Sequence, residues 1–125
     1  MKERKKMIKV AIVDDEYDIV EMIDKYLKRT GGFEVSTFTN PLHVKDRIDN
    51  SYDVVLLDIM MPQLNGLDLL KELHEKLPEL KIIMMTAYST LDKVLKSHRE
   101  GATDYIMKPF SSMKALEEKI VTLVC

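Results

Sequence analysis

The sequence predicts an α/β fold in which a doubly wound parallel sheet of five strands has helices on both faces. Two observations support this fold class: short apolar runs alternate with amphipathic segments five times, and most of the runs contain few polar residues. Strands that are covered by helices on both sides have this composition. With 125 residues, the chain has the length of one domain, residues 1–125.

Four apolar runs rich in Ile, Val, Leu and Met are predicted to be buried strands. They are Ile8–Val13, Val54–Leu57, Ile82–Met85 and Tyr105–Met107. A fifth run, Phe33–Phe38, alternates apolar and polar residues, which is typical of a half-exposed strand at a sheet edge. Five strands suit the flavodoxin-like strand order 2-1-3-4-5, in which the second strand is an edge.

Helices are predicted to link these strands and to end the chain. Apolar residues recur at helical spacing in four segments, 19–27, 70–77, 91–98 and 113–124. Pro78 is expected to stop the second of these helices, and Gly101 the third. A weaker helix is predicted over Pro41–Asn50, because Asn40 is a favourable N-cap and proline is favourable at the first helical position.

Composition and charge exclude several classes of protein. The 19 basic and 21 acidic residues give a net charge of −2, and no basic or aromatic stripe predicts direct nucleic acid binding. The single cysteine excludes an internal disulfide and a cysteine-based zinc cluster, and it favours a cytoplasmic location. The apolar runs are too short to span a membrane.

The two ends of the chain are also informative. Residues 1–6 are basic, which predicts a solvated N-terminal tail. The last apolar helical pattern continues to the end of the chain without a polar tail, so a C-terminal output domain is expected to be absent from this chain.

Polar side chains lie where four of the predicted strands end. Asp14 and Asp15 follow the first strand, Asp58 the third, Thr86 the fourth and Lys108 the fifth. Ligands of open α/β sheets bind beyond the carboxyl ends of the strands, so we expect these side chains to converge there.

The chemistry of this group of residues favours a magnesium-dependent phosphoryl site. Two carboxylates about 4 Å apart repel each other by about 4 kcal/mol at an effective dielectric near 20, and a divalent cation offsets that repulsion. Oxygen ligands without histidine or cysteine fit Mg²⁺ better than zinc. A hydroxyl and an ammonium bind phosphoryl oxygens, while a carboxylate can accept the phosphoryl group.

Short motifs at these strand ends resemble one known family. The motifs are Val13–Glu16, Leu57–Pro62 followed by Gly66, Thr86–Ala87, and Lys108–Phe110. In this order and spacing, the chain resembles a response-regulator receiver domain, the phosphoacceptor domain of two-component signalling. The resemblance covers essentially the whole chain.

The resemblance implies a role for each residue of the site. Asp58 would accept the phosphoryl group from a sensor histidine kinase or a phosphotransfer protein. Mg²⁺, or Mn²⁺ in its place, would be bound by Asp15, Asp58 and the backbone carbonyl of Met60, and by Asp14 through a water. Lys108 would pair with Asp58 before transfer and with the phosphoryl group afterwards. The domain would catalyse its own phosphorylation and slow dephosphorylation.

The resemblance also implies a conformational switch. Thr86 would move to bind the phosphoryl group, and Tyr105 would turn inward into the space that Thr86 leaves. The surface of the fourth helix, fifth strand and fifth helix would then change, and it would bind an output domain, a target protein or a second copy of the chain. Ala87 would leave room for the donor, and a cis peptide at Pro109 would aim Lys108 inward.

Two alternatives come from other classes of protein. One is a receiver-like interaction module that works without phosphorylation, but such modules lose the acceptor, the acidic pair or the lysine. The other is an aspartyl-phosphate phosphatase of the haloacid dehalogenase type. That class has an Asp-x-Asp motif after its first strand, whereas Asp14 and Asp15 are adjacent here, and the chain has no length for a cap domain.

Overall fold

The computed structural model describes residues 7–62, 64–87, 91–108 and 110–124. These residues form one parallel sheet of five strands in the order β2-β1-β3-β4-β5, which confirms the predicted fold class and strand order. The strands are β1 (Ile8–Val13), β2 (Phe33–Phe38), β3 (Val54–Asp58), β4 (Lys81–Ala87) and β5 (Asp104–Lys108). The half-polar strand β2 lies at an edge, as its alternating pattern predicts.

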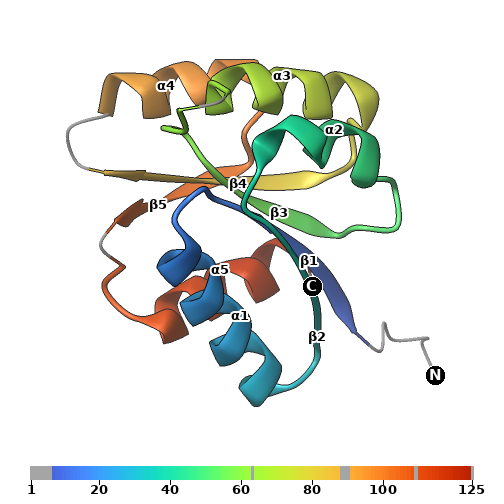
Figure 1. Ribbon diagram of the computed structural model, residues 1–125, viewed down its shortest axis with the longest axis vertical. Helices are drawn as coiled ribbons and strands as arrows, with labels where there is room; N and C mark the ends of the chain where they lie inside the picture. Colours follow the sequence, from blue (N-terminus) through green and yellow to red (C-terminus); the bar gives the residue numbers. More distant parts are fainter. Residues whose placement is uncertain (1–6, 63, 88–90, 109, 125) are drawn as a thin grey trace.

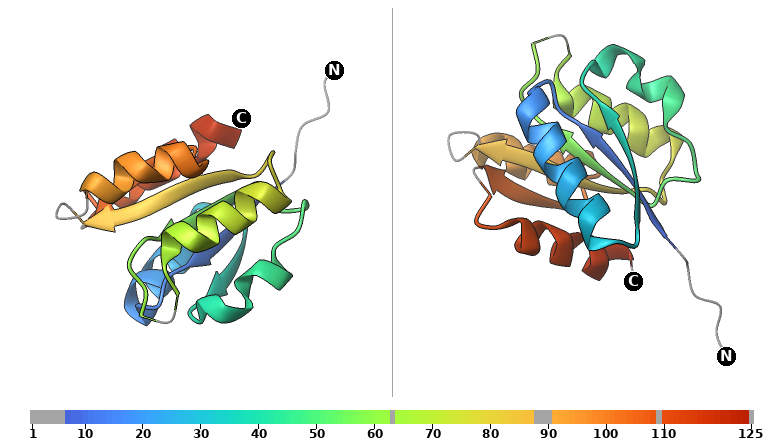
Figure 2. Two further views of the ribbon diagram at one scale, coloured as in Figure 1. Left: turned by 90° about the horizontal axis from the view of Figure 1, so that it is seen from above. Right: turned by 60° about the horizontal axis from the view of Figure 1, so that its bottom comes forward.

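Helices cover both faces of the sheet (Figure 1). They are α1 (Tyr17–Thr30), α2 (Val44–Arg47), α3 (Gly66–Lys76), α4 (Leu91–Glu100) and α5 (Met113–Val124). Helices α2, α3 and α4 lie on one face, and α1 and α5 lie side by side on the other (Figures 1 and 2). In the described part of the chain, no helix combines the length and the apolar character that crossing a membrane requires.

The sheet separates two hydrophobic cores. Side chains alternate between its faces, so Val10 and Ile12 of β1 pack with residues of α1 and α5. Ala11 and Val13 point the other way and pack with residues of α2 and α3. All four are fully buried, so the position of β1 is fixed from both sides.

The segment after β2 forms less helix than its sequence predicts. Asn40 is the N-cap, as expected, because its side chain accepts a hydrogen bond from the Leu42 N–H at 3.0 Å. A 3₁₀ turn (Pro41–His43) follows, and α2 then ends at Arg47 rather than at Asn50. The helix stops because Ile48 is extended and because the Asp49 carboxylate accepts the Ser51 N–H at 2.9 Å, which forms a local turn.

Three strands are longer at their carboxyl ends than their apolar runs predict. Asp58, Thr86 and Lys108 are part of β3, β4 and β5, rather than of the loops that follow. In the sheet, Asp58 is paired with Met85, and Lys108 with Ala87. The polar side chains at this edge are therefore held by the register of the sheet.

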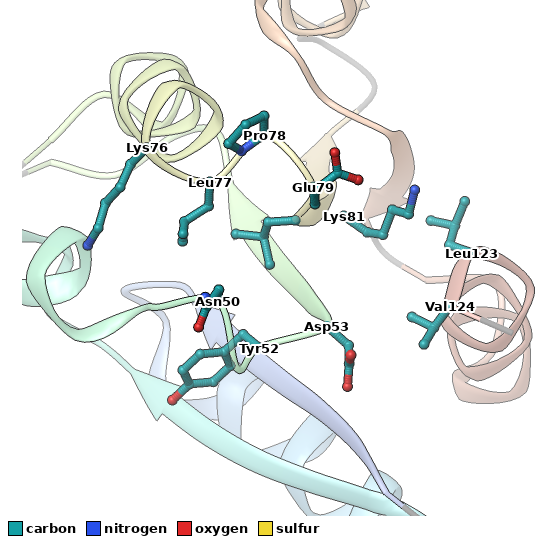
Figure 3. A pocket seen from close by; sticks show the side chains of 11 residues that line it. Asn50, Tyr52, Asp53, Lys76, Leu77, Pro78, Glu79, Lys81, Leu123 and Val124 are labelled. Carbon is teal, nitrogen blue, oxygen red and sulfur yellow. The ribbon is translucent and has the colours of Figure 1, made fainter. Parts of the chain in front are cut away.

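The opposite, amino edge of the sheet has a hollow of about 470 Å³ (Figure 3). It lies where β3 and β4 begin, and Val124 of α5 lines one side. Two of the charged residues that line it have structural partners. Asp53 accepts the Lys9 N–H at 2.8 Å, and Lys76 Nζ donates to the carbonyl oxygens of Lys45 and Ile48 at 2.6 and 3.1 Å.

Candidate functional site

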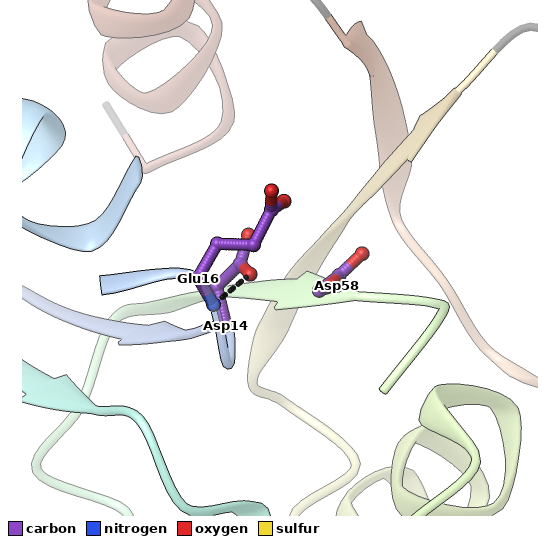
Figure 4. Close-up of side chains that lie close together, drawn as sticks. All are labelled: Asp14, Glu16 and Asp58. Atoms are coloured by element: carbon purple, nitrogen blue, oxygen red, sulfur yellow. Dashed lines mark hydrogen bonds between the residues drawn. The ribbon is translucent and has the colours of Figure 1, made fainter. Parts of the chain in front are cut away.

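Three carboxylates meet at the carboxyl edge of the sheet. Asp14 directly follows β1, Asp58 is the last residue of β3, and Glu16 is the N-cap residue of α1. One oxygen from each lies within 4.8 Å of the other two (Figure 4). The Asp14 side chain is fully buried, and it accepts the Glu16 backbone N–H at 2.9 Å, which fixes the turn between β1 and α1.

Lys108 of β5 supplies the positive charge among these carboxylates. Its ammonium nitrogen lies 2.8 Å from Asp14 Oδ2, 3.2 Å from Glu16 Oε1 and 3.5 Å from Asp58 Oδ1. The Lys108 side chain is only 15% exposed, so solvent weakly screens its contacts with the buried Asp14 and Asp58, whereas Glu16 is 61% exposed. Three carboxylates around one ammonium leave the cluster with an excess of negative charge.

Backbone contacts around Asp58 fix the position of its carboxylate. The Met60 N–H donates to Asp58 Oδ1 at 3.3 Å, and the Gly66 N–H donates to the Ile59 carbonyl at 3.0 Å. A side chain at Gly66 would collide with the Asp58 carbonyl oxygen and would place its Cβ 2.7 Å from the Ile59 Cα. Glycine is therefore required for α3 to begin this close to the end of β3.

Burial and charge shift the pKa values of this site. Burial, and then the neighbouring Asp14 carboxylate, raise the pKa of Asp58 from 3.8 to about 7, although Lys108 opposes the shift. For Lys108, burial lowers the pKa, but its hydrogen bond to Asp14 and the charges of Asp14 and Asp58 outweigh that effect and raise it. Lys108 is thus charged at neutral pH, while Asp58 is divided between its two protonation states.

The other predicted residues lie around this cluster. Thr86 is 1% exposed and follows Met85, the sheet partner of Asp58, so it is next to the acceptor strand at the same edge. Tyr105 is half-buried against the core on the α3 side, and its ring meets the His98 ring edge-on, with centroids 6.0 Å apart. Ala87 ends β4. Pro109 and its predicted cis peptide lie outside the described residues.

Among the described residues, the carboxylates that lie together are those of Asp14, Glu16 and Asp58. Asp15 and the Met60 carbonyl stay predictions as metal ligands. Glu16 was not predicted as a site residue. One signal was available: glutamate is not among the favoured N-cap residues, so its place at the start of α1 needed another explanation.

The donor set fits a hard divalent cation. Its members offer carboxylate oxygens only, which are the ligands that Mg²⁺ prefers in proteins. Three carboxylates outnumber the one ammonium of Lys108, so a bound cation would lower the electrostatic repulsion among them. Asp14, Glu16 and Asp58 are the residues that could hold it.

The fold and the site together define a class of protein: an α/β domain with an acidic cluster and a lysine at the carboxyl ends of its parallel strands. The family model described as "response regulator receiver domain" matches residues 10–121. The chain therefore belongs to the response regulator receiver domain family.

Similar proteins agree with this assignment. The transcriptional regulatory protein MalR of Bacillus subtilis is 40% identical over 108 residues, which is 83% of this chain and 45% of MalR. The response regulator SaeR of Staphylococcus aureus is 36% identical over 105 residues, 84% of this chain and 46% of SaeR. The chain thus spans less than half the length of these relatives.

Solved structures have the same fold. The crystal structure of a response regulator receiver domain protein from Clostridium thermocellum has a TM-score of 0.84 and 32% identity, and the alignment covers 94% of each chain. The structure described as the BeF3-activated DrrB receiver domain has a TM-score of 0.83 and 31% identity, covering 94% of this chain and 97% of DrrB's.

Proposed function

We propose that this receiver domain accepts a phosphoryl group on Asp58 from a phosphohistidine of a sensor histidine kinase or phosphotransfer protein. One observation carries the proposal: the buried Asp58 carboxylate lies in a cluster with Asp14 and Glu16, next to the Lys108 ammonium. Family membership over residues 10–121 supports the same chemistry.

The reaction is a substitution at phosphorus. An Asp58 carboxylate oxygen forms a bond to phosphorus while the P–N bond to the donor imidazole breaks, and the imidazole leaves with the electron pair of that bond. Asp58 must be ionised to attack, and its raised pKa makes the ionised fraction sensitive to neighbouring positive charge. Lys108 supplies such charge from 3.5 Å and is placed to pair with the new phosphoryl oxygens.

Mg²⁺ is the cation proposed for this acidic cluster, with Mn²⁺ able to replace it. When bound, it supplies positive charge to the carboxylates and to the phosphoryl oxygens. The proposed direct ligands are Asp15, Asp58 and the Met60 carbonyl, with Asp14 acting through a water. The closeness of the Asp14 and Asp58 carboxylates supports the part of these two residues.

The output of the domain is proposed to be a conformational switch in which the positions of Thr86 and Tyr105 are coupled. Thr86 lies in the strand between Asp58 and Tyr105, so a movement of Thr86 toward the phosphoryl group changes the space next to the tyrosine ring. The α4–β5–α5 surface then changes its contacts with an output domain, a target protein or a second copy. The names of MalR and SaeR, a transcriptional regulatory protein and a response regulator, support such an output.

Intact mass measured after incubation with acetyl phosphate and Mg²⁺ tests the proposal. We expect one added phosphoryl group in the wild type, and none in Asp58→Asn or when the metal is chelated; Mn²⁺ in place of Mg²⁺ restores it. Asp53→Asn is the matched control, because it makes the same chemical change at the amino edge, and it should be phosphorylated like the wild type.

The alternatives predict different masses. An interaction module that works without phosphorylation would show no adduct in any variant and no binding of beryllofluoride. An adduct that persists in Asp58→Asn would place the acceptor at another residue and would refute the proposal.

A further inference from the structure

Glu16 stands at a helix start without capping it. As the N-cap residue of α1, it makes no side-chain hydrogen bond to the first turn of that helix. Its carboxylate turns instead toward Lys108, and Glu16 Oε1 accepts a hydrogen bond from Lys108 Nζ at 3.2 Å. The side chain is 61% exposed, so this contact, rather than packing, defines its position.

The ammonium of Lys108 is shared unequally among three carboxylates. Its hydrogen bonds at 2.8 and 3.2 Å go to Asp14 and Glu16, both of which belong to the β1–α1 connection. The contact with Asp58, at 3.5 Å, is the longest of the three, and only the Asp14 contact lies within the range of about 2.7–2.9 Å that is typical of charge-assisted hydrogen bonds. Lys108 is therefore held toward β1 and away from the acceptor.

We propose that Glu16 is a positioning residue that holds the Lys108 ammonium on the β1 side of the site and so slows the approach of Lys108 to the phosphoryl group while it is transferred to Asp58. The proposal rests on the proposed function, because it concerns the same phosphoryl transfer. Asp14 is fully buried and its backbone turn is fixed, so it stays with Lys108 in either arrangement. Glu16 is exposed and free to release its contact, which makes it the adjustable member of the pair.

Kinetics with acetyl phosphate test this role, at an Mg²⁺ concentration that saturates each variant, because Glu16 also belongs to the carboxylate cluster that could hold the cation. In that reaction the P–O bond of acetyl phosphate breaks and acetate leaves. Replacing the carboxylate by an amide in Glu16→Gln removes the negative charge and leaves only a weaker hydrogen bond from Lys108 to the amide oxygen. We expect the maximal phosphorylation rate to rise about fivefold, the effect of losing one partly exposed ion pair. The matched control is Glu21→Gln, which removes the same charge from α1 where its partner is the exposed Lys25, at 3.7 Å.

A second variant separates contact from charge. Glu16→Asp keeps the negative charge but shortens the side chain by one methylene, which takes the carboxylate out of hydrogen-bond reach of Lys108. If the contact holds Lys108, the maximal rate rises in Glu16→Asp as it does in Glu16→Gln. A wild-type rate in Glu16→Asp would show that Glu16 merely repels the anionic donor. That effect would change the donor concentration at half-maximal rate and would fade in high salt.

Nuclear magnetic resonance of the Lys108 side-chain nitrogen gives a readout that needs neither donor nor metal. In the metal-free protein we expect the ¹⁵Nζ signal of Lys108 to shift and its protons to exchange faster with water in Glu16→Gln, but not in Glu21→Gln. An unchanged signal in Glu16→Gln would overturn the proposal. If the signal moves while the wild type takes up no phosphoryl group, the contact exists but the proposed function fails, and the rate-setting role fails with it.

Discussion

The two edges of the sheet both carry aspartates and lysines, but the surroundings of these side chains differ. At the amino edge, the Asp53 carboxylate accepts a backbone N–H, and Lys76 Nζ donates to two carbonyl oxygens at the end of α2. At the carboxyl edge, three carboxylates surround the single ammonium of Lys108. The polar groups of the amino edge join segments of the chain, whereas at the carboxyl edge two buried carboxylates, Asp14 and Asp58, repel each other beside the exposed Glu16.

This difference distinguishes aspartates and lysines that stabilise the fold from those that belong to the candidate site. A carboxylate with a backbone partner stabilises the folded state. A carboxylate buried beside another carboxylate destabilises it, which the raised pKa of Asp58 records. The excess charge is retained at the edge where a cation and a phosphoryl group are proposed to bind.

The largest expected effect comes from disrupting the carboxyl edge itself. In Gly66→Ala, the new methyl group would overlap the backbone of Asp58 and Ile59, so we expect the free energy of unfolding to fall by about 3 kcal/mol. Urea denaturation measures it. The control is Gly32→Ala, where φ is +90° but the space is open, so only backbone strain of about 1 kcal/mol is expected. Equal losses in both variants would contradict the close approach of α3 to β3.

Asp58→Asn should stabilise the protein, by about 2 kcal/mol at pH 8. The folded-state pKa of Asp58, about 7, lies above its unfolded value of 3.8, so the folded state binds more protons between these values. The free energy of unfolding of the wild type therefore falls as the pH rises from about 4 to 7. Lys108 keeps Asp14 as its nearest partner in the variant.

Urea titrations at pH 8 and pH 5 check this sign. At pH 5 the folded wild type has a mostly neutral Asp58, so the gain from Asp58→Asn should shrink to less than half of its value at pH 8. A gain of the same size at both pH values would mean that its source is not the burial of an ionised Asp58 carboxylate beside Asp14.

The smallest effect is expected at the amino edge, where the substitution should destabilise the protein, in contrast to Asp58→Asn. Asp53→Ala removes the acceptor of the Lys9 N–H and should lower the free energy of unfolding by about 1 kcal/mol. Phosphorylation by acetyl phosphate should not change. Asp53→Asn keeps an acceptor oxygen and should be close to the wild type. If Asp53→Ala stabilised the protein as Asp58→Asn does, the contrast between the two edges would be wrong.

The sheet and most of the clustered side chains could be predicted because both follow from local patterns. Buried parallel strands are nearly all apolar, so the first polar residue marks the strand end, and parallel strands place their carboxyl ends at one edge. This argument located Asp14, Asp58, Thr86 and Lys108. It needed no knowledge of side-chain conformation.

Glu16 and the end of α2 could not be predicted in this way. The direction of the Glu16 carboxylate is set by Lys108, which lies 92 residues further along the chain, and no local pattern contains that contact. Helix α2 ends early because the Asp49 side chain competes for a backbone N–H, and an aspartate inside a helical pattern does not reveal that competition.

The strand register described above makes the proposed phosphoryl uptake depend on correct folding. Asp58 lies opposite Met85, and Lys108 opposite Ala87. Side chains alternate along a strand, so a slip of β3 or β5 by one residue would turn the acceptor or the lysine to the other face. A molecule with its strands in the wrong register would lack the proposed acceptor site, so the proposed phosphoryl uptake depends on the register of the sheet.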